Sequence, residues 1–172
     1  GADYVNAGHM LPAIDLTVSD GSLTGHDSAT PAVTLVNDPP VGVNDTIPVT
    51  EDTSVTQNVL GNDTDSEGDP LTITAASIDT DGNGTPDPLM LGLPTAIVDS
   101  SGQAIGTITV NSNGDVTFSP AADYTGPVPS LIYTPNDGTT DGTSATVSFG
   151  PIAPVNDAPT IDVTANAFTE DA

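Results

Sequence analysis

The sequence predicts an all-β protein, folded as an antiparallel β-sandwich, and three observations lead to that prediction. Short runs of β-branched and apolar residues alternate with polar residues, as expected for strands with one buried face. Turn signals built from Gly, Pro, Asn and Asp separate these runs about every ten residues. No segment keeps the i, i+3, i+4 spacing of an amphipathic helix for more than a turn.

Two signatures return at one fixed offset. Val36-Asn37-Asp38-Pro39-Pro40 returns as Val155-Asn156-Asp157-Ala158-Pro159, and Thr50-Glu51-Asp52 returns as Thr169-Glu170-Asp171. Both are displaced by 119 residues, from 36 to 155 and from 50 to 169. A fixed period of this kind marks a tandem repeat. We therefore expect one complete repeat at 37–156, the C-terminal strands of a preceding repeat at 1–36, and the start of a following repeat at 157–172.

The charge balance narrows the possible partners. The chain has 24 Asp and Glu residues, no Lys or Arg, and a formal net charge of −24. This charge excludes nucleic acid and anionic membranes as partners. Because no basic side chain can neutralise the carboxylates, we expect metal ions to do so, and hard oxygen ligands favour Ca²⁺. A merely solvated acidic surface and disorder are the alternatives, although regular alternation of β-branched residues argues against disorder.

Covalent and membrane features add little. The chain has no cysteine and no lysine, so neither a disulfide nor a Lys–Asn isopeptide bond can staple the fold. No apolar run approaches 18 residues, and the N-terminus does not resemble a signal peptide. We expect the chain to be an internal part of a longer protein. The apolar fraction of 35% is enough for the thin core of a sandwich.

The expected strands can be placed along the chain. In the N-terminal part, Ile14, Leu16 and Val18 alternate with polar residues as in a half-buried strand, and a second strand is expected at 32–36. The clearest hairpin joins 107–110 to 116–118 through Asn113-Gly114, a pair that favours positive φ. Further strands are expected at 47–49, 54–60, 71–75, 95–98, 131–134 and 144–149.

These strands and turns fit an Ig-like or cadherin-like sandwich of about seven strands. The Val-Asn-Asp-Ala-Pro joints, the Thr-Glu-Asp starts, the run Val59-Leu60-Gly61-Asn62-Asp63 and the Ala122-Asp123-Tyr124 element together resemble the bacterial cadherin-like tandem repeats of giant RTX-type adhesins. The resemblance covers essentially the whole chain. It implies an extracellular, Ca²⁺-dependent extender module on the bacterial surface, stacked between neighbouring repeats of the same polypeptide. The middle of this repeat, 79–105, is longer than the usual pattern.

One acidic loop has the spacing of a calcium loop. Asp79, Asp81, Asn83 and Asp87 stand at loop positions 1, 3, 5 and 9, with Gly84 at position 6 for a sharp turn. Position 12 is Met90 rather than glutamate, so the loop is not an EF-hand. We predict a Ca²⁺ ion here, against the alternative of a solvated Asp/Asn/Gly turn.

A second acidic loop spans 63–69. Its four carboxylates in seven residues would repel one another without a cation, and we predict Asp63, Asp65 and Asp69 as Ca²⁺ ligands ahead of Glu67.

The third candidate is the joint between repeats. The resemblance implies that Asn37, Asp38, Glu51, Asp52 and the turn residue Asp20 gather around one or two bridging Ca²⁺ ions. The equivalent set at the other end is Asn156, Asp157, Glu170, Asp171 and Asp137. The alternative is that both motifs are only turns and strand starts.

We expect no enzyme activity. His9 and His26 have no metal-ligand spacing around them, and no Gly-x-Ser-x-Gly elbow or oxyanion motif accompanies any serine. A ligand-binding domain for sugar, peptide or ice is the alternative function, but it would need exposed aromatics or a ranked threonine array, and the threonines lie scattered in sequence. Head-to-tail association through the partial repeats at both ends is also expected, because their sheet edges would be unpaired.

Overall fold

The computed structural model describes residues 12–31 and 36–157, and in these ranges the chain forms eleven strands and no helix. This confirms the predicted all-β class. The strands are β1 (Ile14–Ser19), β2 (Thr24–Ala29), β3 (Asp45–Ile47), β4 (Val55–Asn58), β5 (Thr72–Ile78), β6 (Asp87–Pro88), β7 (Thr95–Val98), β8 (Ala104–Val110), β9 (Asp115–Pro120), β10 (Leu131–Asn136) and β11 (Ala145–Phe149). No helix that could span a membrane occurs among the described residues.

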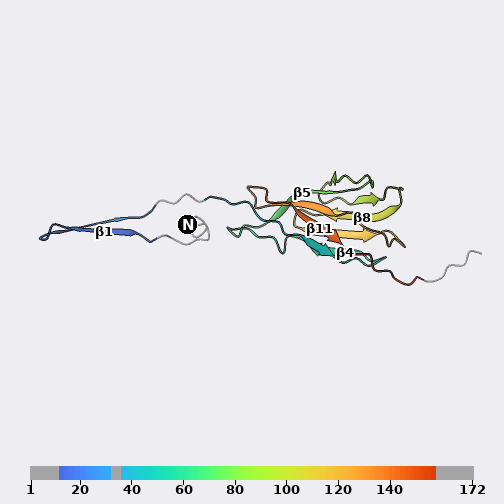
Figure 1. The fold of residues 1–172 in the computed structure, drawn as a ribbon, viewed down its shortest axis with the longest axis horizontal. Coiled ribbons are helices and arrows are strands. Elements are labelled where there is room, and N and C mark those ends of the chain that lie inside the picture. The colour runs from blue at the N-terminus through green and yellow to red at the C-terminus, as the bar shows by residue number, and fades with distance from the viewer. Residues whose placement is uncertain (1–11, 32–35, 158–172) are drawn as a thin grey trace, which may run out of the picture.

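Strands β3 to β11 form two sheets that face each other (Figure 1). One sheet has five strands in the order β3-β11-β10-β5-β6, and the other has four in the order β4-β9-β8-β7. All neighbours are antiparallel except β3 and β11, which pair in parallel. A parallel pairing at this place lets residues 41–50 run along one side of the sandwich beside 143–153.

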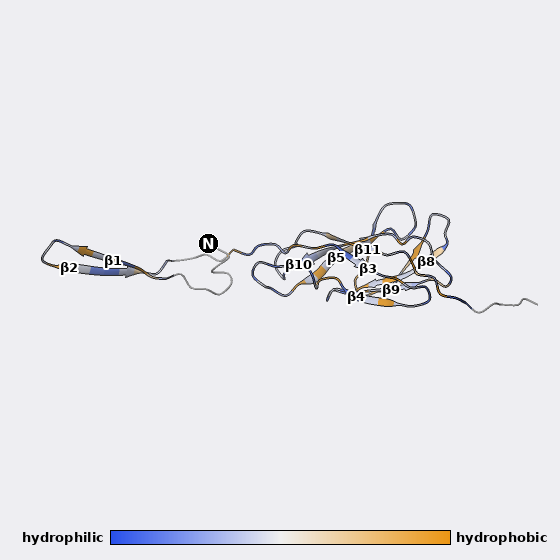
Figure 2. Ribbon diagram, turned by 60° about the horizontal axis from the view of Figure 1, so that its bottom comes forward, coloured by the Kyte–Doolittle hydropathy of each residue, from blue (hydrophilic) through white to orange (hydrophobic). Residues whose placement is uncertain are grey.

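The core lies between the two sheets, where the inward positions of each strand are apolar (Figure 2). Phe118 on β9 and Tyr133 on β10 are the largest fully buried side chains, and Phe118 packs on Phe149 at a ring-centroid distance of 5.1 Å. Buried residues alternate with more exposed ones along most of β8, β9 and β10, which is the alternation on which the strand prediction rested; in β8 the neighbours Ile105 and Gly106 are both buried.

The predicted Asn-Gly hairpin is present. Strands β8 and β9 pair with Ile108 opposite Phe118 and Val110 opposite Val116, and all four side chains are buried as expected. The turn between them has positive φ only at Gly114, where φ is 92°. Within the described residues, Asn113 therefore does not use the left-handed conformation that the sequence pattern allowed.

Strands β1 and β2 form a separate two-stranded hairpin. The second strand predicted at 32–36 falls almost wholly outside the described residues, and Val36 is not in a strand. Strand β2 was missed because its sequence, Thr-Gly-His-Asp-Ser-Ala, has no apolar alternation. The predicted half-burial of Ile14, Leu16 and Val18 is wrong for this structure, because no second sheet among the described residues covers them.

The outer face of the four-stranded sheet carries rows of hydroxyl groups. Thr56, Thr117 and Thr109 lie side by side on β4, β9 and β8. The threonines that are scattered in sequence are thus ranked by the sheet, contrary to the expectation above. Their hydroxyls bond to each other, however: Thr56 and Thr117 Oγ1 atoms are 2.8 Å apart, and a parallel Ser54–Ser119 pair is 2.7 Å apart.

Candidate cation sites at the ends of the sandwich

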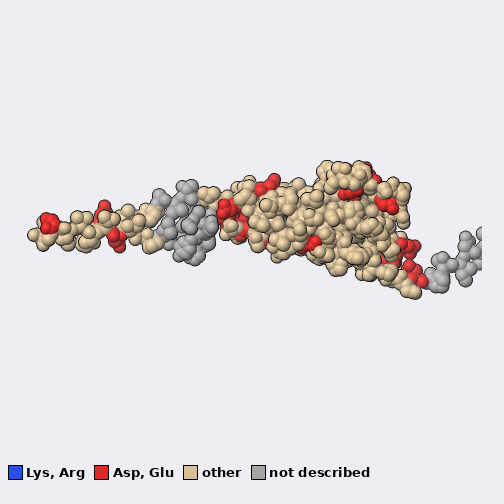
Figure 3. Space-filling model, viewed as in Figure 1, with Lys and Arg blue, Asp and Glu red and all other residues tan. Residues whose placement is uncertain are grey.

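The acidic residues gather at the two ends of the sandwich and along one side loop (Figure 3). Residues 41–50 separate the ends, because nine residues of extended chain span about 30 Å. The structure therefore does not bring Asn37 and Asp38 together with Glu51 and Asp52. The predicted gathering of these four residues around one or two ions is wrong, since the segment between the two motifs runs along the sandwich from one end to the other.

At the C-terminal end, Glu51 meets Asp123 and Asp157. Each of these residues offers a carboxylate oxygen, and the three oxygens lie within 4.8 Å of one another. Glu51 is only 4% exposed, whereas Asp123 and Asp157 are exposed. The backbone N–H of Val155 donates a 2.9 Å hydrogen bond to Glu51 Oε2. The cluster thus joins the start of the repeat, the loop before Tyr124 and the linker that follows the last strand.

Repulsion dominates the electrostatics of this cluster. Burial, followed by the negative charges of Asp52, Asp123 and Glu51, raises the pKa of Asp157. Among the non-glycine residues described, Asp52 and Asp123 have positive φ, at 59° and 58°. Aspartate tolerates this conformation better than most residues do. Two loops thus adopt an uncommon backbone conformation at the place where four carboxylates converge.

The sequence analysis missed Asp123 as a candidate ligand. The Ala-Asp-Tyr element occurs twice in the sequence, as Ala2-Asp3-Tyr4 and as Ala122-Asp123-Tyr124. The Tyr124 hydroxyl donates a 2.8 Å hydrogen bond to the carbonyl of Pro127. Tyr4 lies outside the described residues. The repetition of the acidic residue beside the tyrosine was the available signal.

At the N-terminal end, the linker is tied to the turn after β10. The Asn37 side-chain amide donates a 2.7 Å hydrogen bond to Asp137 Oδ2. This bond and the backbone N–H groups of Thr140 and Thr139 lower the pKa of Asp137. Asp137 was predicted to join Asn156 and Asp157, and this grouping is also wrong, because Asp137 lies at the opposite end of its own repeat from Asp157.

The 63–69 loop lies at this same end, but its carboxylates face different partners. Asp63 accepts hydrogen bonds from the Val43 N–H at 2.7 Å and from the Tyr133 hydroxyl at 3.0 Å. One oxygen of Asp65 caps the N–H groups of Glu67 and Asp69 at 3.0 Å. Among the described residues, Asp63, Asp65 and Asp69 do not form a group whose carboxylate oxygens lie close enough together to share one ion.

Asp65 nevertheless has one unusual atom in this loop. Its Oδ2 is buried and has no hydrogen-bond partner among the described residues. Nearby, the Asp38 N–H donates to Glu67 at 3.3 Å, which links the loop to the linker.

The side loop brings three of its four predicted ligands together. Carboxylate oxygens of Asp79, Asp81 and Asp87 lie within 4.8 Å of one another. Burial raises the pKa of Asp79, but hydrogen bonds from the backbone N–H groups of Gly84, Gly82 and their neighbours outweigh it, so the pKa is lowered overall. Asn83 donates to Asp81 Oδ2 at 2.9 Å rather than pointing its oxygen into the cluster; that oxygen accepts from the Thr85 N–H. Hydrogen-bond donors within the loop therefore stabilise part of its negative charge.

The remaining predicted ligands fall elsewhere. Asp20 lies in the turn between β1 and β2, where N–H groups of Leu23 and Ser22 lower its pKa. Asn156 lies in the linker, and its amide donates to the Asp157 carbonyl at 3.5 Å. Glu170 and Asp171 lie outside the described residues.

Of the clusters, the C-terminal one fits a cation best. Ca²⁺ binds carboxylate and carbonyl oxygens, and it takes six to eight of them. Among the described residues, one N–H group, that of Val155, reaches the Glu51, Asp123 and Asp157 carboxylates. In the side loop, by contrast, backbone and side-chain donors reach all three acidic residues.

The sequence model for a family described as the bacterial cadherin-like domain matches residues 37–151 of this chain. The matched range includes both sheets of the sandwich. No curated protein matches the chain.

Among solved structures, the chain is similar to a nucleoside hydrolase-related hypothetical protein from Saccharophagus degradans, described as associated with carbohydrate metabolism. The two chains are 14% identical, and the match covers 66% of this chain and 26% of the other, with a TM-score of 0.37. This chain thus spans about a quarter of that protein's length. A similarity of this strength carries no argument about fold or activity.

Proposed function

Because the chain belongs to the bacterial cadherin-like domain family, we propose that it is a calcium-binding extender module of a large RTX-type surface adhesin. The module would act outside the bacterial cell, in adhesion and biofilm formation, as one unit in a row of similar repeats. Its proposed role is structural and involves no catalysis. The observation that supports this role most directly is the meeting of Glu51, Asp123 and Asp157 where the chain leaves the sandwich.

The mechanism follows from the position of these carboxylates. Asp157 belongs to the linker, whereas Glu51 and Asp123 belong to the sandwich that precedes it. Without a cation, mutual repulsion disfavours the approach of Asp157 to the sandwich, and burial together with the charges of Asp52, Asp123 and Glu51 raises its pKa. Ca²⁺ bound by Glu51, Asp123 and Asp157, with Asp52 beside them, would replace repulsion by attraction. The linker would then have one preferred direction.

The two Asn-Asp linkers, at 37–38 and 156–157, contact the sandwich through different side chains. Asn37 bonds to Asp137 of the sandwich that follows it, whereas Asp157 gathers with carboxylates of the sandwich that precedes it. Asn37 and Asn156 also make the same local contact, to the carbonyl of the next residue at 3.5 Å. We therefore propose that in each joint the asparagine bonds to the sandwich that follows it, whereas the aspartate binds Ca²⁺ together with the sandwich that precedes it. Asp38 would then take the place of Asp157 in the first joint.

The alternative, a ligand-binding domain, is less well supported. The hydroxyl rows on the four-stranded sheet are the one feature that favours it, since they form a regular polar surface. Their hydroxyls already pair with each other, at 2.8 Å for Thr56 with Thr117.

Thermal unfolding with and without calcium tests the proposal. Extracellular calcium modules have Kd values of roughly 10⁻⁴ to 10⁻³ M, so 10 mM Ca²⁺ should stabilise the chain by about 1.4 to 2.7 kcal/mol relative to EDTA. Asp123→Asn and Asp157→Asn should each reduce this gain, whereas Asp15→Asn, which removes the same charge from the exposed hairpin, should leave it intact. Equal melting temperatures in EDTA and Ca²⁺, together with no binding heat in calorimetry, would refute the proposal.

A further inference from the structure

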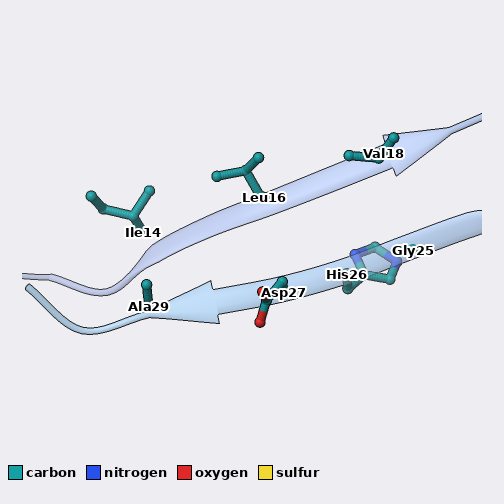
Figure 4. Close-up of a pocket in the computed structure, with 7 residues that line it drawn as sticks. All are labelled: Ile14, Leu16, Val18, Gly25, His26, Asp27 and Ala29. Carbon is teal, nitrogen blue, oxygen red and sulfur yellow. The ribbon is translucent and has the colours of Figure 1, made fainter.

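The hairpin of β1 and β2 has one apolar face with nothing packed on it among the described residues. Ile14, Leu16 and Val18 point to the same side of the hairpin (Figure 4) and are 57%, 58% and 65% exposed. Together with Ala29 they line a shallow hollow. A row of large apolar side chains of this kind is characteristic of an interaction surface rather than of a free one.

The turn of this hairpin reproduces the turn between β10 and β11. Asp20 Oδ1 accepts hydrogen bonds from the backbone N–H groups two and three residues later, at 2.9 and 2.8 Å. Asp137 Oδ1 accepts the two corresponding bonds, at 2.7 Å each. The next residue is glycine in both turns, with φ of 94° at Gly21 and 96° at Gly138. The two turns therefore have the same conformation.

The strands on either side of the turn are also equivalent. Thr17 Oγ1 on β1 lies 3.0 Å from a ring nitrogen of His26 on β2, and Thr134 Oγ1 on β10 lies 3.0 Å from the Ser144 hydroxyl before β11. Thr17 precedes Asp20 by three residues, as Thr134 precedes Asp137. Strand β1 thus corresponds to β10, and β2 to β11, with one extra residue after the second turn.

This correspondence shows where the apolar face belongs. Counted from the turn, Ile14, Leu16 and Val18 correspond to Leu131, Tyr133 and Pro135, which are all buried in the sandwich. Leu131 and Tyr133 have no exposed surface at all.

The edges of the hairpin give a second, independent indication. In the sandwich, β10 has β5 beside it in antiparallel orientation, and β11 has β3 beside it in parallel orientation. Among the described residues, β1 and β2 pair only with each other. Both outer edges of the hairpin therefore offer the backbone groups that the complete repeat uses for sheet pairing.

We propose that the hairpin is the last strand pair of a second sandwich and docks onto a cadherin-like core that lacks its own final two strands. The partner supplies an antiparallel strand next to β1, a parallel strand next to β2, and a facing sheet over Ile14, Leu16 and Val18. Its binding combines backbone hydrogen bonds at two edges with burial of one apolar face. The inference does not depend on calcium.

Asp27 defines the chemistry that the partner must present. It lies opposite Leu16, in the place that Ala145 takes opposite Tyr133. In the complete repeat the polar group at this level is the Tyr133 hydroxyl, which donates to Asp63. In the hairpin the polar group is a carboxylate and comes from the other strand. The partner must therefore carry a hydrogen-bond donor where this repeat has the acceptor Asp63.

Asp27 also argues against a second copy of the hairpin as the occupant. Two hairpins packed face to face would bring two Asp27 carboxylates into one small apolar contact, in a chain of net charge −24. The unmodified chain should therefore be monomeric in EDTA. A dimer that Leu16→Thr dissolves would overturn the proposal and assign the face to self-association.

A transplant within the full chain tests the fit. Residues 131–147 are replaced by the sequence of 14–29, and the chain is made with Asp63 and with Asp63→Asn. The asparagine keeps an oxygen for the Val43 N–H and turns an amide donor towards the transplanted aspartate. Asp63→Asn should raise the melting temperature of the transplant by about 4 °C or more, measured in EDTA. In the unaltered chain, the same substitution should lower it, because Tyr133 loses a charged acceptor.

A matched control isolates the apolar face. The transplant that carries Ile14→Thr, Leu16→Thr and Val18→Thr should fail to unfold cooperatively, even with Asp63→Asn. The proposal is overturned if this control melts like the apolar transplant, if Asp63→Asn lowers the melting temperature of both chains, or if no transplant folds. Because all melts are made in EDTA, none of these outcomes depends on whether the chain binds calcium.

Discussion

The backbone N–H of Val155 donates a 2.9 Å hydrogen bond to Glu51 Oε2, and this contact ties the linker after the last strand to a motif 104 residues earlier in the chain. Glu51 is buried, yet Asp123 and Asp157 lie against it. One side chain thus serves two purposes: its oxygen satisfies a backbone donor, and its charge contributes to a cluster that is repulsive without a cation.

Substitutions at Glu51 should separate these two purposes. Glu51→Gln keeps an oxygen for Val155 but removes a charge, so in EDTA the melting temperature should stay equal or rise, and the gain on adding Ca²⁺ should fall. Glu51→Ala should lower stability in both conditions by about 1 to 3 kcal/mol, because the Val155 N–H loses a charged acceptor. Paired melts of the two variants measure this. A calcium gain in Glu51→Gln equal to that of the unaltered chain would contradict the assigned role.

Asp157 should make the calcium-free protein more stable as the pH falls. Its folded-state pKa is raised above its usual value of 3.8, so the cost of its charge is fully present above the raised pKa and disappears as the pH falls through it. In EDTA, melting temperatures measured from pH 7 downwards should therefore first increase. Asp157→Asn should weaken this increase. An unchanged pH profile in the variant would show that another group causes it.

Asp137 should have the opposite effect at lower pH. Its folded-state pKa is lowered, so its contribution to stability is fully present above the usual value of 3.8 and is lost as the pH falls through the lowered pKa. Asn37→Ala removes the hydrogen bond that contributes most to the lowered pKa of Asp137. It should reduce stability at pH 7 and make the profile below pH 4 less steep. Asn44→Ala, which removes an amide whose oxygen accepts a hydrogen bond from the Thr146 N–H, serves as the control and should keep the acid slope.

The Tyr133 hydroxyl should be worth a measurable part of the fold's stability. It lies in the core and bonds to the Val59 carbonyl at 2.9 Å and to both oxygens of Asp63 at 3.0 Å. Tyr133→Phe should cost about 1 to 3 kcal/mol in denaturant unfolding, because the buried acceptors lose their donor. Burial and the charge of Asp63 also raise the pKa of Tyr133 strongly. In an alkaline absorbance titration, one tyrosine should therefore ionise only on unfolding.

The acidic side loop should depend more on Gly82 than on Gly84. Both have positive φ, but a Cβ at Gly82 would collide with the backbone of Asp99 and Ser100, whereas a Cβ at Gly84 meets open space. Gly82→Ala should therefore lower the melting temperature more than Gly84→Ala, which carries only the cost of a left-handed conformation. Equal losses in the two variants would show that the contact with 99–100 is not rigid.

The all-β class could be read from the sequence alone. Alternation along β8, β9 and β10 identified strands whose inner residues are buried, because a two-residue period can be read without knowing the partner strand. The 119-residue offset predicts which motifs are equivalent. The spacing of Asp79, Asp81 and Asp87 also led to a cluster that the structure contains, since a loop brings its own residues together.

Which distant acidic residues meet depends on the tertiary structure. The family resemblance placed Glu51 with Asn37, but the segment between them runs along the sandwich and brings Glu51 to Asp123 and Asp157. Strand β2 likewise forms because it pairs with β1, although its own sequence has no alternation of apolar and polar residues. Local order follows from the residues themselves, whereas contacts between distant segments follow from the direction in which each strand crosses the domain.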